Sequence, residues 1–219
     1  MNLSFDPQKF TLCNKTSALS SLKLVRPRDP ETVLDTISDE QYEKDKFLPY
    51  WAELWPSSEV LFEYLTKNPI RKGFRAIELG CGIGHISAFL VSRGVDTVAT
   101  DISREACCYA RYNTISNGGK GKCLCCDWRH SPFTPNRFDL VIASDVLYER
   151  RWIDPVLSFS EELVSQNGEV LVADPCRSHW SEFRRCAAQR GFEVRIVVDK
   201  LVNEGNTTVQ IASMKKAGK

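Results

Sequence analysis

The sequence lacks any long apolar run, and no stretch of its 219 residues approaches the roughly 18 apolar residues that a membrane-spanning helix needs. It also lacks a charge excess, because 29 Lys and Arg stand against 28 Asp and Glu. Proteins that bind nucleic-acid phosphates usually carry a clear basic excess, so we expect no nucleic-acid partner and no membrane partner. The amino terminus shows no secretory signal, and no internal repeat or low-complexity tract is present. These absences favour a soluble, globular protein of the cytoplasm.

Histidine is scarce, since the chain holds only His85, His130 and His179, and we expect each to be structural. Cysteine, by contrast, occurs nine times. An odd count with adjacent pairs does not resemble the disulfide framework of a small secreted protein. The densest cluster, Cys123-Leu-Cys125-Cys126, lacks the Cys-x-x-Cys spacing of a zinc site. We therefore expect no metal, and we interpret these residues as buried strand cysteines of a protein in a reducing compartment.

The pattern of apolar residues divides the chain near residue 48. Residues 1–47 hold only short apolar pieces, followed by a charged stretch at 39–45, and are predicted to form an N-terminal extension that packs on the core, with room for a short hairpin. Residues 48–219 alternate between strand and helix patterns and are predicted to form one domain. Strands are predicted at 74–79, 95–100, 122–126, 138–144 and 170–173. Helices are predicted from Pro56 or one of the two serines after it to 65, at 84–93, from an N-cap at Ser103 to about 113, from an N-cap at Asp154 through 163, and from 178 to about 191.

Alternating strands and helices with short connections are typical of a parallel, doubly wound sheet. Two further strands are predicted at 192–198 and 207–214, and the eight residues between them are too few for a parallel crossover. The predicted fold class is therefore α/β, with a Rossmann-like seven-strand sheet, helices on both faces and a C-terminal antiparallel hairpin.

A glycine-rich turn follows the first predicted strand of this sheet, with Gly80, Gly82 and Gly84 in Gly-x-Gly-x-Gly spacing. Glycines let a backbone approach a ligand closely, and the start of the following helix offers free N–H groups. The dinucleotide fingerprint Gly-x-Gly-x-x-Gly would place its third glycine at His85, so the spacing disfavours a nicotinamide dinucleotide.

Two acidic residues flank this turn. Glu78, two residues before the first glycine, is badly placed for a pyrophosphate but could meet an amino-acid ammonium group. Asp101 ends the next strand, 21 residues after Gly80, where a carboxylate can accept ribose hydroxyls. A ligand with a ribose and an ammonium group but no pyrophosphate is S-adenosylmethionine, which is the cofactor that we predict.

With these residues the sequence resembles the class I, seven-strand methyltransferases, whose loop E/D-x-G-x-G-x-G matches Glu78–Gly84. Two more segments, LPYWAELWPSS at 48–58 and ASDVLY at 143–148, are similar to those of the seven-strand protein-lysine methyltransferases called family 16. The sequences of these two segments and of Asp174-Pro-Cys176-Arg177 are most similar to one branch of this family, the enzymes that methylate the electron-transfer flavoprotein β-subunit. That branch typically has glycine at the position of Cys176. The resemblance covers about residues 48 to 214.

The resemblance implies a set of site residues. Asp145 and Tyr148, of a D-x-x-Y motif, would face the substrate amine. Asp127 and Trp128 follow the third strand, where a carboxylate can accept from the adenine amine and an indole can stack. The residues expected to contact the cofactor are Trp55, Glu78, Gly80, Cys81, Gly82, Asp101, Ile102, Asp127, Trp128 and Ser144.

Simpler interpretations stay open for some of them. Trp128 can be merely buried at a strand end, Asp145 can be a turn or helix-capping carboxylate, and Trp51 and Trp55 can be packing residues under the sheet, above all Trp51. The leading hypothesis is a monomeric N-methyltransferase that acts on lysine of a specific cytosolic protein. The alternatives are an N-methyltransferase of a small, nicotinamide-like amine and a cofactor-binding module without catalysis.

Overall fold

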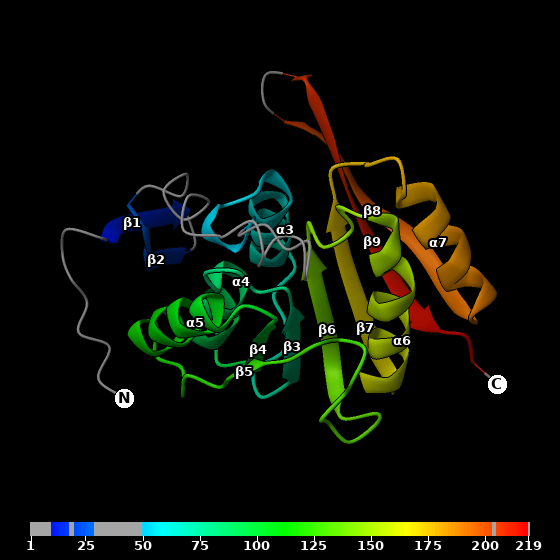
Figure 1. The fold of residues 1–219 in the computed structure, drawn as a ribbon, viewed down its shortest axis with the longest axis horizontal. Helices are drawn as coiled ribbons and strands as arrows, with labels where there is room; N and C mark the ends of the chain where they lie inside the picture. Colours follow the sequence, from blue (N-terminus) through cyan, green and yellow to red (C-terminus); the bar gives the residue numbers. More distant parts are fainter. Residues whose placement is uncertain (1–9, 18–19, 29–49, 203–204, 219) are drawn as a thin grey trace, which may run out of the picture.

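The structure is a computed structural model that describes residues 10–17, 20–28, 50–202 and 205–218 (Figure 1). Its centre is a seven-stranded sheet with the order β5-β4-β3-β6-β7-β9-β8, in which β9 runs antiparallel to both of its neighbours. The predicted doubly wound sheet with a C-terminal antiparallel hairpin is thereby confirmed. The strands are β3 (Arg75–Leu79), β4 (Asp96–Asp101), β5 (Cys123–Cys125), β6 (Phe138–Ser144), β7 (Val164–Asp174), β8 (Phe192–Val202) and β9 (Thr207–Lys216).

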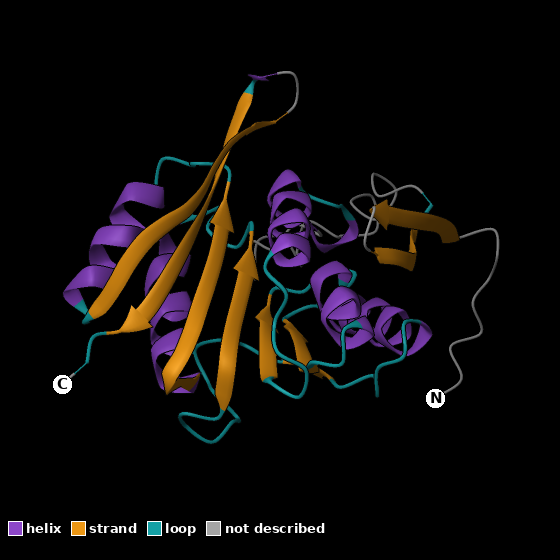
Figure 2. Cartoon of the chain, turned by 180° about the vertical axis from the view of Figure 1, so that it is seen from behind, coloured by secondary structure: helices purple, strands orange, loops and turns teal. Residues whose placement is uncertain are grey.

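Helices cover both faces of the sheet (Figure 2). Side chains alternate between the faces along β6: Leu140 and Ile142 join the apolar cluster of α3 and α4, whereas Val141 and Ala143 join that of α6 and α7. Because both faces are buried, the inner strands are almost continuously apolar. The helices are α3 (Pro56–Lys67), α4 (His85–Ser92), α5 (Arg104–Ser116), α6 (Ile153–Leu163) and α7 (Trp180–Gln189), with short 3-10 turns η1 (Tyr50–Ala52) and η2 (Arg150–Trp152).

Helix starts follow the local sequence in one case and depart from it in another. The Ser103 hydroxyl caps α5 by accepting the N–H of Ala106 at 3.1 Å, as its position before the helix predicts. The predicted N-cap at Asp154 is wrong, because η2 runs directly into α6, which begins one residue earlier. The Asp154 carboxylate instead forms an ion pair with Arg190, after the end of α7.

The strands at the C-terminal side of the sheet are longer than their apolar runs predict. β7 starts six residues earlier, at Val164, and β8 continues to Val202. Figure 1 shows the hairpin of β8 and β9 projecting beyond the rest of the sheet. Pairing of β8 with β9 satisfies the hydrogen-bonding groups of the backbone in this hairpin. The two strands therefore continue although polar residues interrupt the apolar pattern.

A separate hairpin of β1 (Phe10–Ser17) and β2 (Ser20–Pro27) lies against α4 and α5. Leu22 and Leu24 of β2 are fully buried in the apolar cluster that α3 and α4 form on the sheet. The division of the chain into residues 1–47 and 48–219 stays a prediction, and the charged stretch at 39–45 lies outside the described residues.

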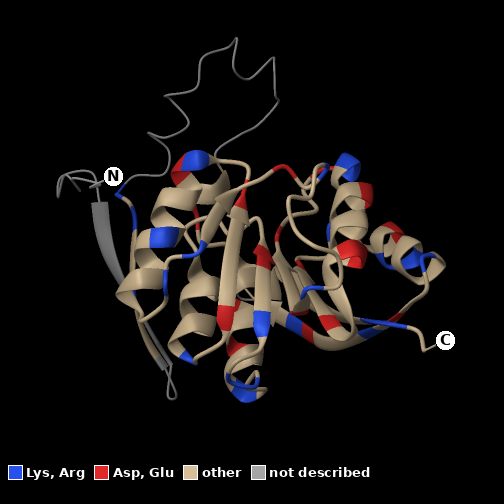
Figure 3. Ribbon diagram, turned by 90° about the horizontal axis from the view of Figure 1, so that it is seen from below, with Lys and Arg blue, Asp and Glu red and all other residues tan. Residues whose placement is uncertain are grey.

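In Figure 3, Lys and Arg residues are interspersed with Asp and Glu residues along the ribbon. Within the described ranges, no helix combines the length and the apolar character that a membrane crossing requires.

Candidate cofactor and acceptor site

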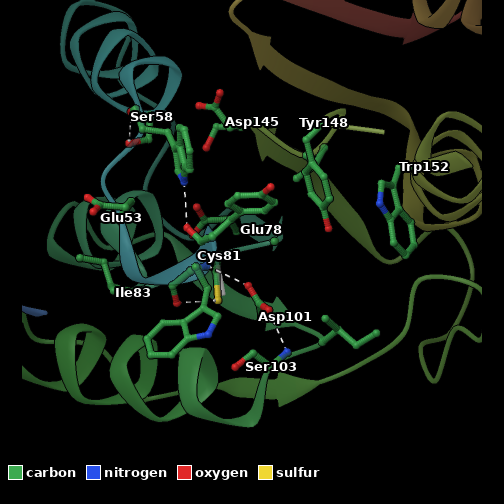
Figure 4. A pocket seen from close by; sticks show the side chains of 18 of the residues that line it. Glu53, Ser58, Glu78, Cys81, Ile83, Asp101, Ser103, Asp145, Tyr148 and Trp152 are labelled. Atoms are coloured by element: carbon green, nitrogen blue, oxygen red, sulfur yellow. Dashed lines mark hydrogen bonds between the residues drawn. The ribbon is translucent and has the colours of Figure 1, made fainter. Parts of the chain in front are cut away.

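A pocket of about 920 Å³ lies at the carboxyl ends of the parallel strands (Figure 4). Strand order reverses between β3 and β6, and ligands of doubly wound sheets bind at this switch point. The structure brings all of the predicted site residues into the lining of this one pocket. They are Trp55, Glu78, Gly80, Cys81, Gly82, Asp101, Ile102, Asp127, Trp128, Ser144, Asp145 and Tyr148.

The glycine-rich loop between β3 and α4 forms the floor of the pocket. A Cβ at Gly80 would lie 2.8 Å from Val146 Cγ1, and a Cβ at Gly82 would lie 2.9 Å from the carbonyl oxygen of Trp51. Both glycines also have positive φ angles, 65° and 50°. Glycine is therefore required at both positions by space and by backbone conformation.

Asp101, at the end of β4, shapes this loop. Its Oδ2 accepts the N–H of Gly82 at 3.0 Å, and its Oδ1 accepts the N–H of Ser103 at 2.9 Å. Burial raises the pKa of this carboxyl group, and the backbone donors oppose that effect. Each carboxylate oxygen has a second lone pair, so Asp101 can hold the loop and still accept hydroxyl groups of a ribose.

Glu78, in β3, is buried below the loop. Its Oε2 accepts the backbone N–H of Ser87 at 2.8 Å and the hydroxyl of Ser87 at 2.5 Å, which ties β3 to α4. Burial raises the pKa of Glu78 to about 8, and the two hydrogen bonds from Ser87 oppose it. A cation bound in the pocket would favour the ionised form of this carboxyl group.

The side of the pocket at β5 carries the residues predicted to meet the adenine. The ring of Trp128 lies against Gly80 and contacts Trp152 edge-on, with 5.7 Å between the ring centroids. Hydrogen bonds from Arg129 lower the pKa of Asp127 and hold its carboxylate in place. A planar apolar surface beside an ionised acceptor suits an aromatic base that carries an amino group.

Asp145 lies at the opposite side of the pocket, just after β6. Its backbone has a φ of 59°, a conformation that non-glycine residues rarely adopt and that clusters at functional sites. The carboxylate is buried, and Nη1 of Arg177 lies 3.0 Å from its Oδ1 and 3.0 Å from Oδ2 of the fully buried Asp174. Burial raises the pKa of Asp145 to about 6, while Arg177 opposes the rise. Two acids and one arginine leave this cluster one negative charge when both acids are ionised.

Aromatic rings stand beside this carboxylate. Tyr148 contacts Tyr50 edge-on at 5.3 Å between the ring centroids, and Tyr50 contacts Trp55 at 5.8 Å. The Trp55 indole N–H donates to the Tyr50 carbonyl at 2.8 Å, which fixes the two residues relative to each other. Burial raises the pKa of Tyr148, so its hydroxyl stays protonated and can donate. A carboxylate next to aromatic faces is suited to an amine or ammonium group.

Some residues at the pocket were not predicted as site residues. Arg177 belongs to the Asp-Pro-Cys-Arg motif at the end of β7, which was the available signal. Tyr50 belongs to the segment LPYWAELWPSS, which was the available signal, whereas Trp152 carries no sequence signal beyond its aromatic character. Trp51, for which packing under the sheet was favoured, lies at the pocket instead, because η1 crosses the glycine-rich loop and places its ring 5.5 Å from that of Tyr109 in α5.

The cysteines only partly match the expectation of buried strand thiols. Cys81 and Cys126 are buried and Cys123 is half-buried, but Cys125 is exposed, because β5 is the edge strand of the sheet. Across the described ranges, no three His, Cys, Asp or Glu side chains are grouped so that they could share a metal ion.

Comparison with known proteins agrees with this architecture. Residues 76–161 match the protein family described as "Methyltransferase domain". The chain is 28% identical over 61% of its length to the electron transfer flavoprotein beta subunit lysine methyltransferase of Danio rerio, and covers 53% of that protein. It is 29% identical over 57% of its length to the protein-lysine methyltransferase METTL21E of Mus musculus, of which it covers 56%. The chain thus spans about half the length of these curated relatives.

Solved structures share the fold. The ribosomal protein L11 methylase of Lactobacillus delbrueckii subsp. bulgaricus superposes with a TM-score of 0.59 at 17% identity, covering 74% of this chain and 81% of that one. Residues that line the pocket come both from the matched range 76–161 and from outside it, as Tyr50, Trp55 and Arg177 show.

Proposed function

We propose that this chain, which carries a methyltransferase domain, transfers the methyl group of S-adenosylmethionine to the side-chain amine of a lysine in a protein substrate. The observation that carries the proposal is that the glycine-rich loop and the pair Asp145 and Tyr148 line one pocket. One shared pocket is what direct transfer of a methyl group from cofactor to acceptor would require. The names of the relatives, which are lysine methyltransferases, support a lysine acceptor.

The residues present fit the cofactor. Asp101 would offer acceptors for the ribose, Trp128 and Ile102 would offer apolar surface for the adenine, and Asp127 could accept from the adenine amino group. Gly80 and Gly82 carry no side chains and have positive φ angles, so their backbone itself lines the pocket in which the ligand would lie. When bound, S-adenosylmethionine supplies an electrophilic methyl group on a sulfonium.

The acceptor amine sets the remaining requirements. A lysine has a reference pKa of about 10.4 and must lose a proton before its nitrogen can attack. Burial between Tyr50, Tyr148 and Trp55 lowers that pKa, because a dry site disfavours the ammonium form. Above pH ~6 the Asp145 carboxylate is ionised and can hold and orient the amine, and the Tyr148 hydroxyl can hydrogen-bond to it.

In methyl transfer the bond from the lysine nitrogen to the methyl carbon would form as the bond from that carbon to sulfur breaks, with S-adenosylhomocysteine as the leaving group. Such a displacement needs alignment rather than a covalent nucleophile. The chain's residues hold the amine and the cofactor in one line and exclude water from the reacting atoms. As parts of the same proposal, the partner is a specific protein, no nucleic acid or membrane takes part, and the enzyme acts as a monomer in the cytoplasm.

Labelled-methyl transfer in a cell lysate tests this function. A discrete labelled protein band whose label maps to lysine by mass spectrometry is expected. Label only in small molecules would instead establish the alternative acceptor, a small amine, and no label at all would indicate a cofactor-binding module.

An isosteric substitution tests the acceptor site. Asp145→Asn is expected to lower the transfer rate at least ~100-fold while S-adenosylhomocysteine affinity, measured by calorimetry, changes less than about threefold. The matched control is Asp139→Asn, since Asp139 is paired with Arg75 away from the pocket. Retained transfer activity in Asp145→Asn would remove Asp145 from the acceptor site.

A further inference from the structure

One buried side chain of α5 joins two parts of the chain that are far apart in sequence. Nδ2 of Asn113 donates to the carbonyl of Val25 in β2 at 2.9 Å and to the carbonyl of Ile83 in the glycine-rich loop at 2.7 Å. Its Oδ1 accepts the N–H of Val25 at 2.8 Å. Both amide hydrogens are used, and the residue is fully buried. A single amide group thus links the N-terminal hairpin to the loop predicted to carry the cofactor.

The loop rests on the same helix elsewhere. A Cβ at Gly84 would lie 2.7 Å from Cα of Ala110, which lies one turn before Asn113 on α5. Ile83, whose carbonyl Asn113 binds, is buried and lines the pocket. On its other side the loop contacts the backbone of Trp51. The loop is therefore confined from both sides, and its carbonyl at Ile83 has its partner in Asn113.

Buried side chains of β2 anchor the hairpin to the core, so the hydrogen bonds from Asn113 join the loop to a fixed strand. Leu22 and Leu24 are fully buried, so β2 cannot slide without exposing both side chains. One turn further along α5, Asn117 makes a similar pair of bonds with β2: its Nδ2 donates to the carbonyl of Lys23 at 2.9 Å, and its Oδ1 accepts the N–H of Lys23 at 3.3 Å. The Asn117 side chain also donates a hydrogen bond to the carbonyl of Asn113 in α5. Asn117 does not belong to the lining of the pocket.

We propose that Asn113 is a positioning residue that couples docking of the β1–β2 hairpin to the shape of the glycine-rich loop, so that cofactor binding and hairpin docking stabilise each other. Such coupling is reciprocal, because a ligand that favours one arrangement of the loop must favour the hairpin position that supports it by the same factor. The inference rests on the cofactor of the proposed function and does not depend on the methyl acceptor.

Calorimetry with S-adenosylhomocysteine on full-chain variants tests the link. Asn113→Ala leaves the Ile83 carbonyl without its partner and is expected to weaken binding about tenfold, in line with the loss of one buried hydrogen bond. Asn117→Ala is the matched control, since it removes the same kind of contact to β2 but none to the loop. We expect its dissociation constant to stay within about twofold of the unsubstituted protein.

Hydrogen exchange measures the coupling in the opposite direction, first in the unsubstituted protein and then in the Asn113→Ala variant. Saturation with S-adenosylhomocysteine is expected to slow exchange of the amides of residues 21–26, and Asn113→Ala is expected to abolish that protection. Amides of residues 197–202 in β8, away from the pocket, serve as the internal reference.

Two results would overturn the inference. Equal affinities of the Asn113→Ala and Asn117→Ala variants would show that the contact to Ile83 does not position the loop. Unchanged exchange of residues 21–26 at saturation would show that the hairpin does not respond to the cofactor, even where the Asn113 variant does not fold. In both cases the unsubstituted protein still binds, whereas no binding of S-adenosylhomocysteine at millimolar concentration would instead refute the cofactor assignment itself.

Discussion

Removing the positive charge beside Asp145 is the sharpest test of how the acceptor site works. Arg177→Met keeps most of the side-chain volume but deletes the guanidinium that lies 3.0 Å from both Asp145 and Asp174. Asp174 is fully buried and also accepts the N–H of Arg177 at 2.8 Å, a backbone contact that the substitution leaves in place. The substitution would therefore leave two neighbouring buried acids without their shared cation.

The size of the effect follows from the geometry. An opposite charge within about 4 Å lowers the pKa of a carboxyl group by about 1–3 units. Arg177 is partly exposed, with 23% of its side chain accessible, so solvent screens it and the lower part of that range applies. Starting from a pKa of about 6, Asp145 in Arg177→Met is expected to titrate near pH ~7–8, with the buried Ser57 hydroxyl as the remaining neighbour that favours ionisation.

Carbon-13 NMR of protein labelled at aspartate carboxyl groups measures this pKa without knowledge of the acceptor. The Asp145 signal is assigned by its loss in Asp145→Asn, and the titration is recorded with S-adenosylhomocysteine bound. Arg177→Lys, which keeps a positive charge but loses the planar fork, is expected to give an intermediate value. Once an acceptor is known, the rising limb of the pH dependence of kcat/KM should move in the same direction.

A pKa of Asp145 that stays within about half a unit in Arg177→Met would refute the reasoning, because the ion pair would then contribute nothing to the ionisation of Asp145. A signal that titrates near pH ~4 in the unsubstituted protein would refute it as well, because the carboxyl group would then be solvated like an exposed aspartate.

Two further substitutions test the floor of the pocket. Gly82→Ala would place a Cβ 2.9 Å from the Trp51 carbonyl oxygen, at a backbone φ of 50°. We expect the free energy of unfolding in urea to fall by about 1–3 kcal/mol and S-adenosylhomocysteine to bind at least ~tenfold more weakly. Unchanged affinity would contradict the close packing of η1 on the loop. Because the pKa of Glu78 is about 8 in the folded protein against 4.5 ordinarily, the folded state holds a proton that the unfolded state has released, and stability contributed by this group is lost as pH rises from 4.5 through about 8. Glu78→Gln is expected to remove that decline in urea unfolding free energy, and an identical pH slope in both proteins would contradict it.

The parts of the site that sequence predicted are local. The glycine-rich loop, Glu78 and Asp101 are recognisable because each lies at the end of a strand that its own apolar residues mark, and carboxyl ends of parallel strands meet at one edge. The pattern of apolar residues likewise predicts the layers of helices on the sheet, because it indicates which side chains each face of the sheet must bury.

The parts that sequence did not predict depend on distant contacts. Arg177 becomes significant only because β7 lies beside β6, which brings its guanidinium to Asp145. Asp154 is a residue type that favours the N-cap position. The preceding 3-10 turn η2 instead leads directly into the helix, and the Asp154 carboxylate forms an ion pair with Arg190. Cys125 lies in a strand and has an apolar side chain, but none of the described strands pairs with the outer side of β5.

The position of β9 in the sheet has a consequence for the order in which the protein can be built. β9 lies between β7 and β8, and its residues Ile211, Ala212 and Met214 are fully buried. Of the described strands, β9 is the last to be synthesised. Until translation has passed Lys216, the side of β7 that faces away from β6 has no paired strand and β8 has no neighbouring strand. The half of the sheet from β5 to β7 can assemble during synthesis, whereas the half that carries α7 must wait for the final strand. A chain without β9 would expose both the edge of β7 and the apolar face of α7, and such exposed edges and apolar faces favour aggregation.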